Sequence, residues 1–355
     1  MTRASIRTAM LAACSIAVII VVIALFQDLR QLALVFLVAY AAAVSVVLGT
    51  LAMTLIAHLT TATWFRPFRA PAEQVIRTLP VLAGLGVLLL VAMPTLYPWA
   101  GTRDPARVYL NGPFFVVRWI VYWIAWLAIA RGLHTARRIE RQGEVARAAR
   151  RYRVVSCVGL VALAFTMTFA AIDWMMSLTP DWASTIYGVI WFAGGLVGAL
   201  ALLAVLASGS DATPAVPTAD EHSLGKLLVT FVLFWLYVSF AQYVVIWSGD
   251  VPEEVTWYAA RTHGGWGVVA GVLVLFGFAL PFVLLLLAPV KRSRRALAAL
   301  GLLLLAMHYV DTFWMLAPGV VPVDWWTVIA GCAVLVLVVA ALAWRFSRLP
   351  AAAPV

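Results

Sequence analysis

Long apolar runs separated by short polar connections dominate the chain. A membrane-spanning helix needs roughly 17–25 predominantly apolar residues to cross the hydrocarbon layer. Ten runs meet that length, near residues 9–26, 32–57, 79–97, 113–131, 153–175, 184–207, 225–248, 265–289, 296–317 and 326–345. The pattern therefore predicts an all-α integral membrane protein with ten transmembrane helices.

Composition supports the same class. Of the 355 residues, 65% are hydrophobic and only 11% are charged, too few to cover a soluble protein of this size. The net charge of +10 does not indicate nucleic acid as a partner, because the basic residues cluster beside the ends of the apolar runs. We therefore expect a lipid membrane, and no nucleic acid, around this chain.

The distribution of basic residues predicts the orientation. If the N-terminus is cytoplasmic, 20 of the 25 basic residues lie in the tails and in the connections on the cytoplasmic side. Cytoplasmic loops of membrane proteins carry an excess of lysine and arginine. We expect both termini in the cytoplasm.

Two acidic residues lie within apolar runs, near the ends predicted to face outside. Asp173 follows about twenty residues of its run, which at 1.5 Å per residue places it about 30 Å from the inner side, and Asp311 lies slightly deeper. A carboxylate there needs a partner, a water-filled cavity or a proton path. His308 shares a helical face with Asp311, so the two can exchange a proton or hold a polar headgroup. A structural hydrogen bond to a neighbouring helix is the alternative for each residue.

The two acids belong to segments of similar plan. In each, an apolar run ends on an acid, then tryptophan and methionine, a proline and an Asp-Trp pair. If these two segments are equivalent, spans two to five and spans six to nine form two pseudo-symmetric four-helix bundles. The axis that relates the bundles then runs along the membrane normal. The predicted units are a peripheral first span (1–30), the bundles (31–183 and 184–320), and a peripheral last span with the tail (321–355).

Glycine and tryptophan positions add two further expectations. Gly194-x-x-x-Gly198 and Gly267-x-x-x-Gly271 predict close helix approach. The sixteen tryptophans concentrate near span ends, which is typical of anchoring at the membrane interface, although some can line an apolar slot for a flat ring.

Histidine and cysteine positions argue against a metal cofactor in this chain. A membrane haem usually needs two histidines facing each other at similar depth, whereas His58 lies at the inner end of span two and His308 in the outer half of span nine. The three cysteines lie singly, without the spacing of a metal cluster. We expect no haem, iron–sulfur cluster or other metal site here.

Three segments resemble a known family: FAAIDWMMSLTPDWASTIYGV, LAMHYVDTFWML and the stretch from LGKLLVTFV to RTHGGW. They resemble the second large membrane subunit of alternative complex III, a bacterial quinol:cytochrome c or quinol:acceptor oxidoreductase. Its large membrane subunits belong to the polysulfide-reductase (NrfD-like) family. The likeness extends from about Leu96 to Pro318.

The resemblance implies a ten-span subunit in a bacterial inner membrane. Its implied partners are a sister membrane subunit of the same family, a periplasmic iron–sulfur subunit and c-type haem subunits, and quinol is the implied small-molecule ligand. The expected proton acceptors or relay groups are Asp311, His308 and Asp173. Further outer-side candidates for quinone binding are Glu253, Glu254, Arg261, Trp174 and Trp314.

The leading hypothesis is therefore a redox-complex subunit that anchors periplasmic electron carriers and contributes an outer-side quinol pocket or a proton route. Such a subunit is not expected to be catalytic alone. Two other functions are compatible with the same residues: a secondary transporter built on an internal repeat, and a purely structural anchor.

Overall fold

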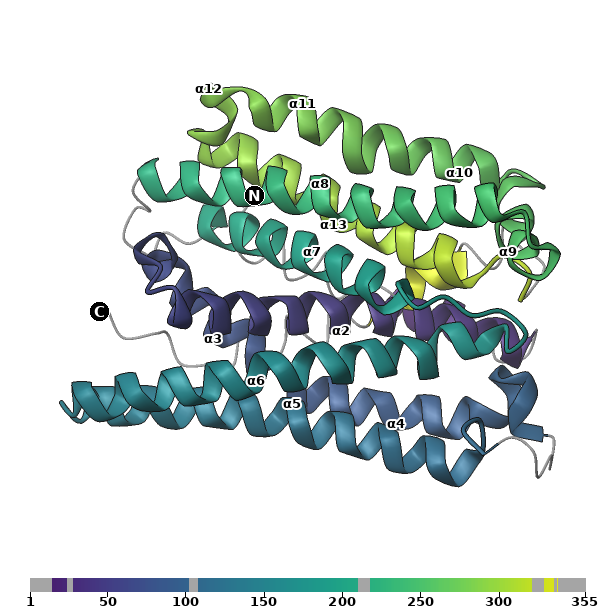
Figure 1. Ribbon diagram of the computed structural model, residues 1–355, viewed down its shortest axis with the longest axis horizontal. Coiled ribbons are helices and arrows are strands. Elements are labelled where there is room, and N and C mark those ends of the chain that lie inside the picture. Colours follow the sequence, from purple (N-terminus) through teal and green to yellow (C-terminus); the bar gives the residue numbers. More distant parts are fainter. Residues whose placement is uncertain are drawn as a thin grey trace.

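The computed structural model describes residues 15–23, 28–101, 108–209, 218–320, 329–334 and 337. Those residues form helices and turns and include no strand. Within them, eight helical segments are long and apolar enough to cross a membrane, and they run side by side (Figure 1). The all-α membrane class is confirmed.

The eight segments coincide with predicted spans two to nine. Predicted spans one and ten lie only partly within the described residues, where residues 15–23 and 329–334 are helical. The elements are α2 Leu29–Leu59, η1 Thr63–Phe68, α3 Arg69–Ile76, α4 Leu79–Leu96, η2 Pro98–Gly101, α5 Gly112–Arg141, α6 Val145–Trp174, η3 Met176–Leu178, α7 Tyr187–Gly209, α8 Thr218–Gly249, α9 Pro252–Thr262, α10 Trp266–Val272, η4 Leu273–Ala279, α11 Leu280–Leu286, α12 Ala288–Lys291 and α13 Arg294–Leu316.

Helices α5 and α6 are longer than their apolar runs predict. Only Gln142–Glu144 separates them, and Gly143 adopts a φ of 87° in that turn. Arginine and glutamate are good helix formers, so the polar residues continue the helices beyond the apolar stretch. Residues 132–152, which the predicted spans leave as a connection, therefore form the tip of a helical hairpin, and this tip projects past the other helices in Figure 1.

Helices α2 and α7 form the centre of the molecule. α2 packs against α4, α6, α7 and α13, while α7 also contacts α6, α8 and α13. Their backbones touch where they cross: a Cβ on Gly49 would overlap the carbonyl oxygen of Gly195, and one on Gly195 would lie 2.6 Å from that of Ser45. Only glycine permits this approach, which brings the two groups of helices together.

The two glycine pairs differ in their surroundings. A Cβ on Gly198 would lie 2.6 Å from a methyl group of Val46, and one on Gly194 would meet His308, so this pair does allow close packing. Gly271 has no atom within 4 Å of its hypothetical Cβ, and Gly267 meets only Thr262 of the preceding turn. The expectation of helix packing was wrong for this second pair.

Several tryptophans near span ends are buried in the protein rather than placed at the membrane interface. Trp99, Trp174, Trp182 and Trp257 are all less than 7% exposed, whereas Trp247 is 68% exposed. The buried rings contact other aromatic rings, among them a stacked pair of Trp182 and Trp257 with centroids 4.5 Å apart. Interfacial anchoring was the wrong interpretation for these four residues.

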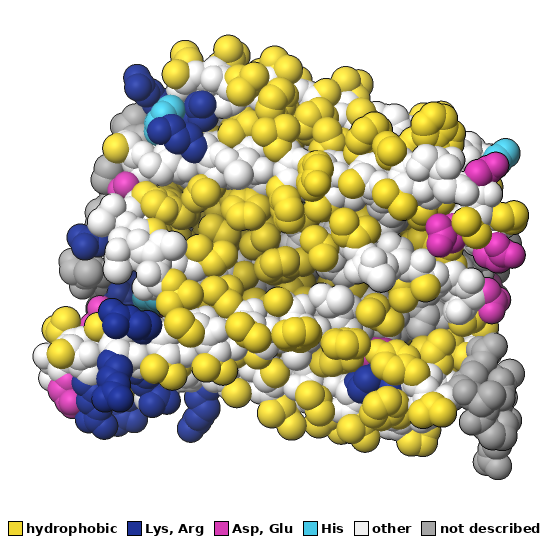
Figure 2. All heavy atoms as spheres, viewed as in Figure 1, with side chains coloured by type: hydrophobic (Ala, Val, Ile, Leu, Met, Phe, Trp, Pro, Cys, Tyr) yellow, Lys and Arg dark blue, Asp and Glu magenta, His cyan; other side chains and the backbone are white. Residues whose placement is uncertain are grey.

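Charged side chains gather at the two ends of the helices. Figure 2 shows Lys and Arg mainly at one end, Asp and Glu mainly at the other, and a broad hydrophobic band between them. Many residues of that band are highly exposed, such as Val91 at 74% and Val268 at 72%. An apolar surface of this extent is suited to contact with lipid chains.

Candidate functional site

Asp311 and His308 line a small cavity inside the second group of helices. Both side chains are buried, at 7% and 6% exposure, and they lie one turn apart on α13. Helices α7 and α8 contribute the facing walls through Gly194 and Trp235. The cavity volume is about 20 Å³, which is enough for one water molecule. The spacing of three therefore brings the two groups to one site, as expected.

Hydrogen bonds fix the tautomer of His308. The Ser45 hydroxyl donates to the carbonyl oxygen of Ala42 at 2.9 Å, so its oxygen accepts from Nε2 of His308 at 2.7 Å. In the neutral ring Nδ1 is then an acceptor, and it has no partner among the described residues. A Cβ on Gly194 would lie 2.9 Å from Nδ1, so the missing side chain leaves this nitrogen accessible from the cavity.

Asp311 has a neutral partner only. Trp235 donates its indole N–H to Oδ2 at 3.1 Å, and within the described part of the chain no basic side chain forms an ion pair with this carboxyl group. A hypothetical Cβ on Gly194 would lie 3.7 Å from Oδ2, so His308 Nδ1 and this carboxylate oxygen both border the same glycine. One water in the cavity is suited to bridge them.

A π-helical segment forms the remaining wall. Leu273 and Gly277 of η4 line the cavity, and η4 runs without a break between α10 and α11. Short π-helical turns within α-helices are frequent at functional sites, because they widen the helix and displace side chains locally. This feature was not predicted from the sequence, where residues 265–289 have an ordinary apolar pattern.

Asp173 occupies a different environment. Its Oδ2 accepts from Nε of Arg118 at 2.8 Å and from the Tyr122 hydroxyl at 2.6 Å, while Oδ1 accepts from Nη2 of Arg118 at 2.9 Å. Arg118 also donates to the Tyr109 carbonyl oxygen and lies over the Tyr109 ring. The carboxylate is fully buried and paired with a cation on α5.

Sequence reasoning identified Asp173 but missed both of its partners. The available signal was Arg118 itself, which lies in an apolar run and therefore needs an acid. Nothing in the pattern indicated which acid, because the two residues are 55 positions apart. That Asp173 accepts protons stays a prediction, and its geometry is that of a structural ion pair.

Trp174, adjacent to Asp173, belongs to an aromatic cluster between the two groups of helices. Its ring centroid lies 5.7 Å from those of Tyr40 and Trp126 and 6.2 Å from that of Trp191. Its side chain is 1% exposed, and its indole nitrogen has no partner among the described residues. Its place in the fold is that of a core residue.

The remaining outer-side candidates lie on or beside α9. Arg261 is 2% exposed, donates to the carbonyl oxygens of Trp257 and Met315 at 2.8 and 2.6 Å, and lies over the Trp257 ring. Burial lowers the pKa of Arg261 to about 10, so the group stays charged at neutral pH. It joins α9 to the end of α13, where the ring of Trp314 packs edge-on against that of Trp257.

Glu253 and Glu254 stand apart from these groups. They lie in the first turn of α9, where Glu253 is exposed and Glu254 is half-buried. Neither lines the cavity beside Asp311. In the described ranges no three His, Cys, Asp or Glu side chains come together in a way that could hold a metal ion.

Comparisons with known proteins do not identify a family. No protein-family model matches the sequence, and a search of curated proteins finds no match.

Proposed function

We propose that this chain is a membrane subunit of a quinol-oxidising complex of the alternative complex III type, and that its own contribution is a proton route through the Asp311–His308 cavity. The observation that carries the proposal is a buried carboxyl group without a cationic partner, beside an imidazole nitrogen without any described partner, at a cavity for one water. Buried membrane acids of this kind are typical of proton relays.

The cavity volume favours a proton route over a quinol pocket at this position. Pockets for small organic ligands usually have volumes of about 300–1,000 Å³. A cavity of about 20 Å³ admits a water molecule but not a quinone ring. Quinol oxidation elsewhere in the complex would release protons, which Asp311 and His308 can pass on by alternately binding and releasing them.

The proposal includes the finer architecture. Spans two to five (α2, α4, α5 and α6) and spans six to nine (α7, α8, α10–α11 and α13) form two related four-helix bundles, with peripheral first and last spans. The contacts of α2 with α4 and α6, and those of α7 with α8 and α13, fall within the two groups and support this division. Both acids lie in the last two turns of corresponding helices, α6 and α13.

The proposal also includes the setting. The end rich in Lys and Arg faces the cytoplasm of a bacterium, both termini lie on that side, and the acidic end faces the periplasm. There the chain contacts an iron–sulfur subunit and c-type haem subunits, with a sister membrane subunit beside it in the bilayer. The separation of charge along the helices supports the orientation.

The test uses the native complex, purified through a tag on this chain. Copurification of c-type haem and iron–sulfur subunits is the first expected result. In proteoliposomes we then expect Asp311→Asn to lower proton release at least about ten-fold, since proton transfer by a positioned group contributes roughly 10²–10⁴-fold to rates.

The matched control is Asp250→Asn. Asp250 is an exposed acid, and its φ of 47° is one that asparagine tolerates. We expect wild-type proton release from this variant. If the complex with Asp311→Asn assembles and keeps wild-type quinol oxidation and proton release, the proton route is wrong and this chain has a purely structural anchoring role.

A further inference from the structure

A second and much larger cavity lies at the basic end of the helices. Its volume is about 490 Å³, within the range of small-molecule sites. It is enclosed by α2, α3, the start of α4, and α5, with Tyr152 of α6 at its edge. None of the residues expected to carry function lies there.

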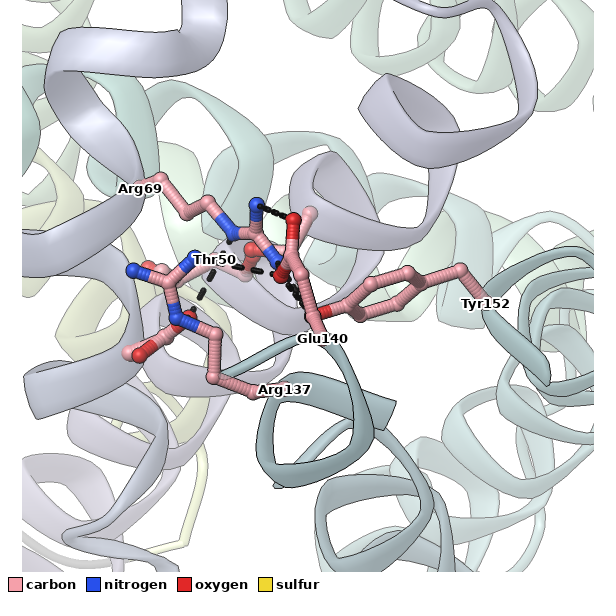
Figure 3. A network of polar contacts seen from close by, with 7 residues as sticks. Thr50, Arg69, Arg137, Glu140 and Tyr152 are labelled. Carbon is pink, nitrogen blue, oxygen red and sulfur yellow. Dashed lines mark hydrogen bonds and ion pairs between the residues drawn. The ribbon is translucent and has the colours of Figure 1, made fainter. Parts of the chain in front are cut away.

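A network of ion pairs lies beside this cavity (Figure 3), and two of its members, Glu73 and Tyr152, line the cavity. Arg69 donates to both carboxylate oxygens of Glu140, at 3.2 and 2.7 Å, and also to the Tyr152 hydroxyl. Arg137 reaches Glu140 at 3.2 Å and Glu73 at 3.6 Å, and Arg69 lies 3.5 Å from Glu73. The network fixes α3 against the α5–α6 hairpin, and its two arginines neutralise its two glutamates.

The other cations of the cavity are unpaired. Arg77 and Arg131 line it, and within the described residues neither forms an ion pair. Glu73, the acid that lines the cavity, already contacts Arg69 and Arg137. The free charge facing the cavity is therefore positive, which favours an anionic group of the size and fork geometry of a phosphate.

Apolar side chains make up another part of the lining, and one side of the cavity reaches the protein surface. Leu79, Leu127 and Leu133 contribute to it, and Pro80 on the cavity rim is exposed. Arg131 ends the apolar run predicted as a membrane span, and about 15 Å of mostly polar helix continues past it to the end of α5 at Arg141. That depth corresponds to the headgroup region of a bilayer.

We propose that this cavity binds the headgroup of an anionic phospholipid, with the phosphate on Arg77 and Arg131 and the glycerol region toward His58 and Thr54. Beyond the cavity, α4 and α5 present exposed apolar side chains, Leu88 and Ile124 among them, which acyl chains can cover. Basic pockets between helices on the cytoplasmic side are known to take such headgroups. The site is independent of the proposed proton route.

The test is native mass spectrometry of the full chain released from vesicles that contain phosphatidylglycerol and phosphatidylcholine. We expect wild-type protein to retain one phosphatidylglycerol. Arg77→Gln with Arg131→Gln should weaken its binding about 25-fold, on the order of five-fold for each arginine. The matched charge control is Arg150→Gln with Arg153→Gln, which removes two exposed arginines of α6 outside the cavity and should change binding less than two-fold.

A second pair of variants tests the cavity itself at constant charge. Ala130→Trp places a large ring in the cavity and should abolish retention, whereas Ala128→Trp, on the exposed face two residues away, should not. Three results would overturn the proposal: equal losses in the two arginine pairs, unchanged retention in Ala130→Trp, or a retained quinone in place of phospholipid. Binding of millimolar inorganic phosphate without retention of any phospholipid would also overturn it, because the site would then recognise free phosphate rather than a lipid.

Discussion

Asp173→Asn should destabilise the protein far more than Asp311→Asn, although both changes remove one membrane acid. An asparagine in place of Asp173 would leave the Arg118 guanidinium buried without its counter-charge. In the wild type the Arg118 and Asp173 side chains are 9% and 1% exposed, so solvent screens their interaction little. Removing one member of such a buried pair costs about 3–5 kcal/mol.

Asp311→Asn removes no ion pair. The amide oxygen of asparagine can still accept from Trp235, and the change in the free energy of unfolding should stay below about 1 kcal/mol. The expected difference between the two variants is therefore at least about 2 kcal/mol, which corresponds to roughly a thirty-fold change in the unfolding equilibrium.

Reversible unfolding of the purified chain in mixed micelles measures this difference, with tryptophan fluorescence as the signal. The double variant Arg118→Met with Asp173→Leu removes both charges and should recover most of the lost stability, since hydrophobic replacement of a buried pair is often neutral. Wild-type stability of Asp173→Asn, or a larger loss in Asp311→Asn, would refute the assignment of Asp173 to a structural ion pair.

Four other outcomes follow from described contacts. Gly195→Leu should prevent the close crossing of α2 and α7 and cost about 1–3 kcal/mol or more in unfolding experiments, while Gly271→Leu, which meets open space, should be tolerated. Gly194→Ala should lower proton release with less effect on stability, because its methyl group would lie between His308 Nδ1 and the cavity. Arg261→Gln should loosen α9 from α13 and speed limited proteolysis at residues 250–265. Reporter fusions at positions 144 and 252 should report opposite sides of the membrane; agreement between them would contradict the proposed topology.

The positions of the eight described spans could be predicted because a bilayer imposes a length and an apolar composition on every crossing helix. The position of His308 and Asp311 on one face of a helix followed from the helical repeat alone. Helix ends in water are less constrained, which is why the continuation of α5 to Arg141 was not predicted.

Contacts between distant segments could not be predicted in the same way. Many helices carry tryptophan, so the sequence did not indicate that Trp235 would donate to Asp311, or that Trp257 would lie in the core rather than at the interface. The large basic cavity was missed for a similar reason. Arg77 and Arg131 are two of many arginines at the basic end of the helices, and only their position in the lining of the cavity distinguishes them.

The π-helical segment η4 also determines which neighbours its helix contacts. Before it, α10 packs against α9 and α13, and after it, α11 packs against α8. A π-helical turn contains one residue more than the α-helical turn that it replaces. The side chains that follow it are therefore rotated by about 100° about the helix axis, relative to a regular α-helix. Deleting a single residue between positions 273 and 279 should therefore restore a regular helix, turn α11 away from α8 and close the cavity beside Asp311. The cavity beside Asp311 can thus be gained or lost through a change in chain length, without any substitution among the residues that line it.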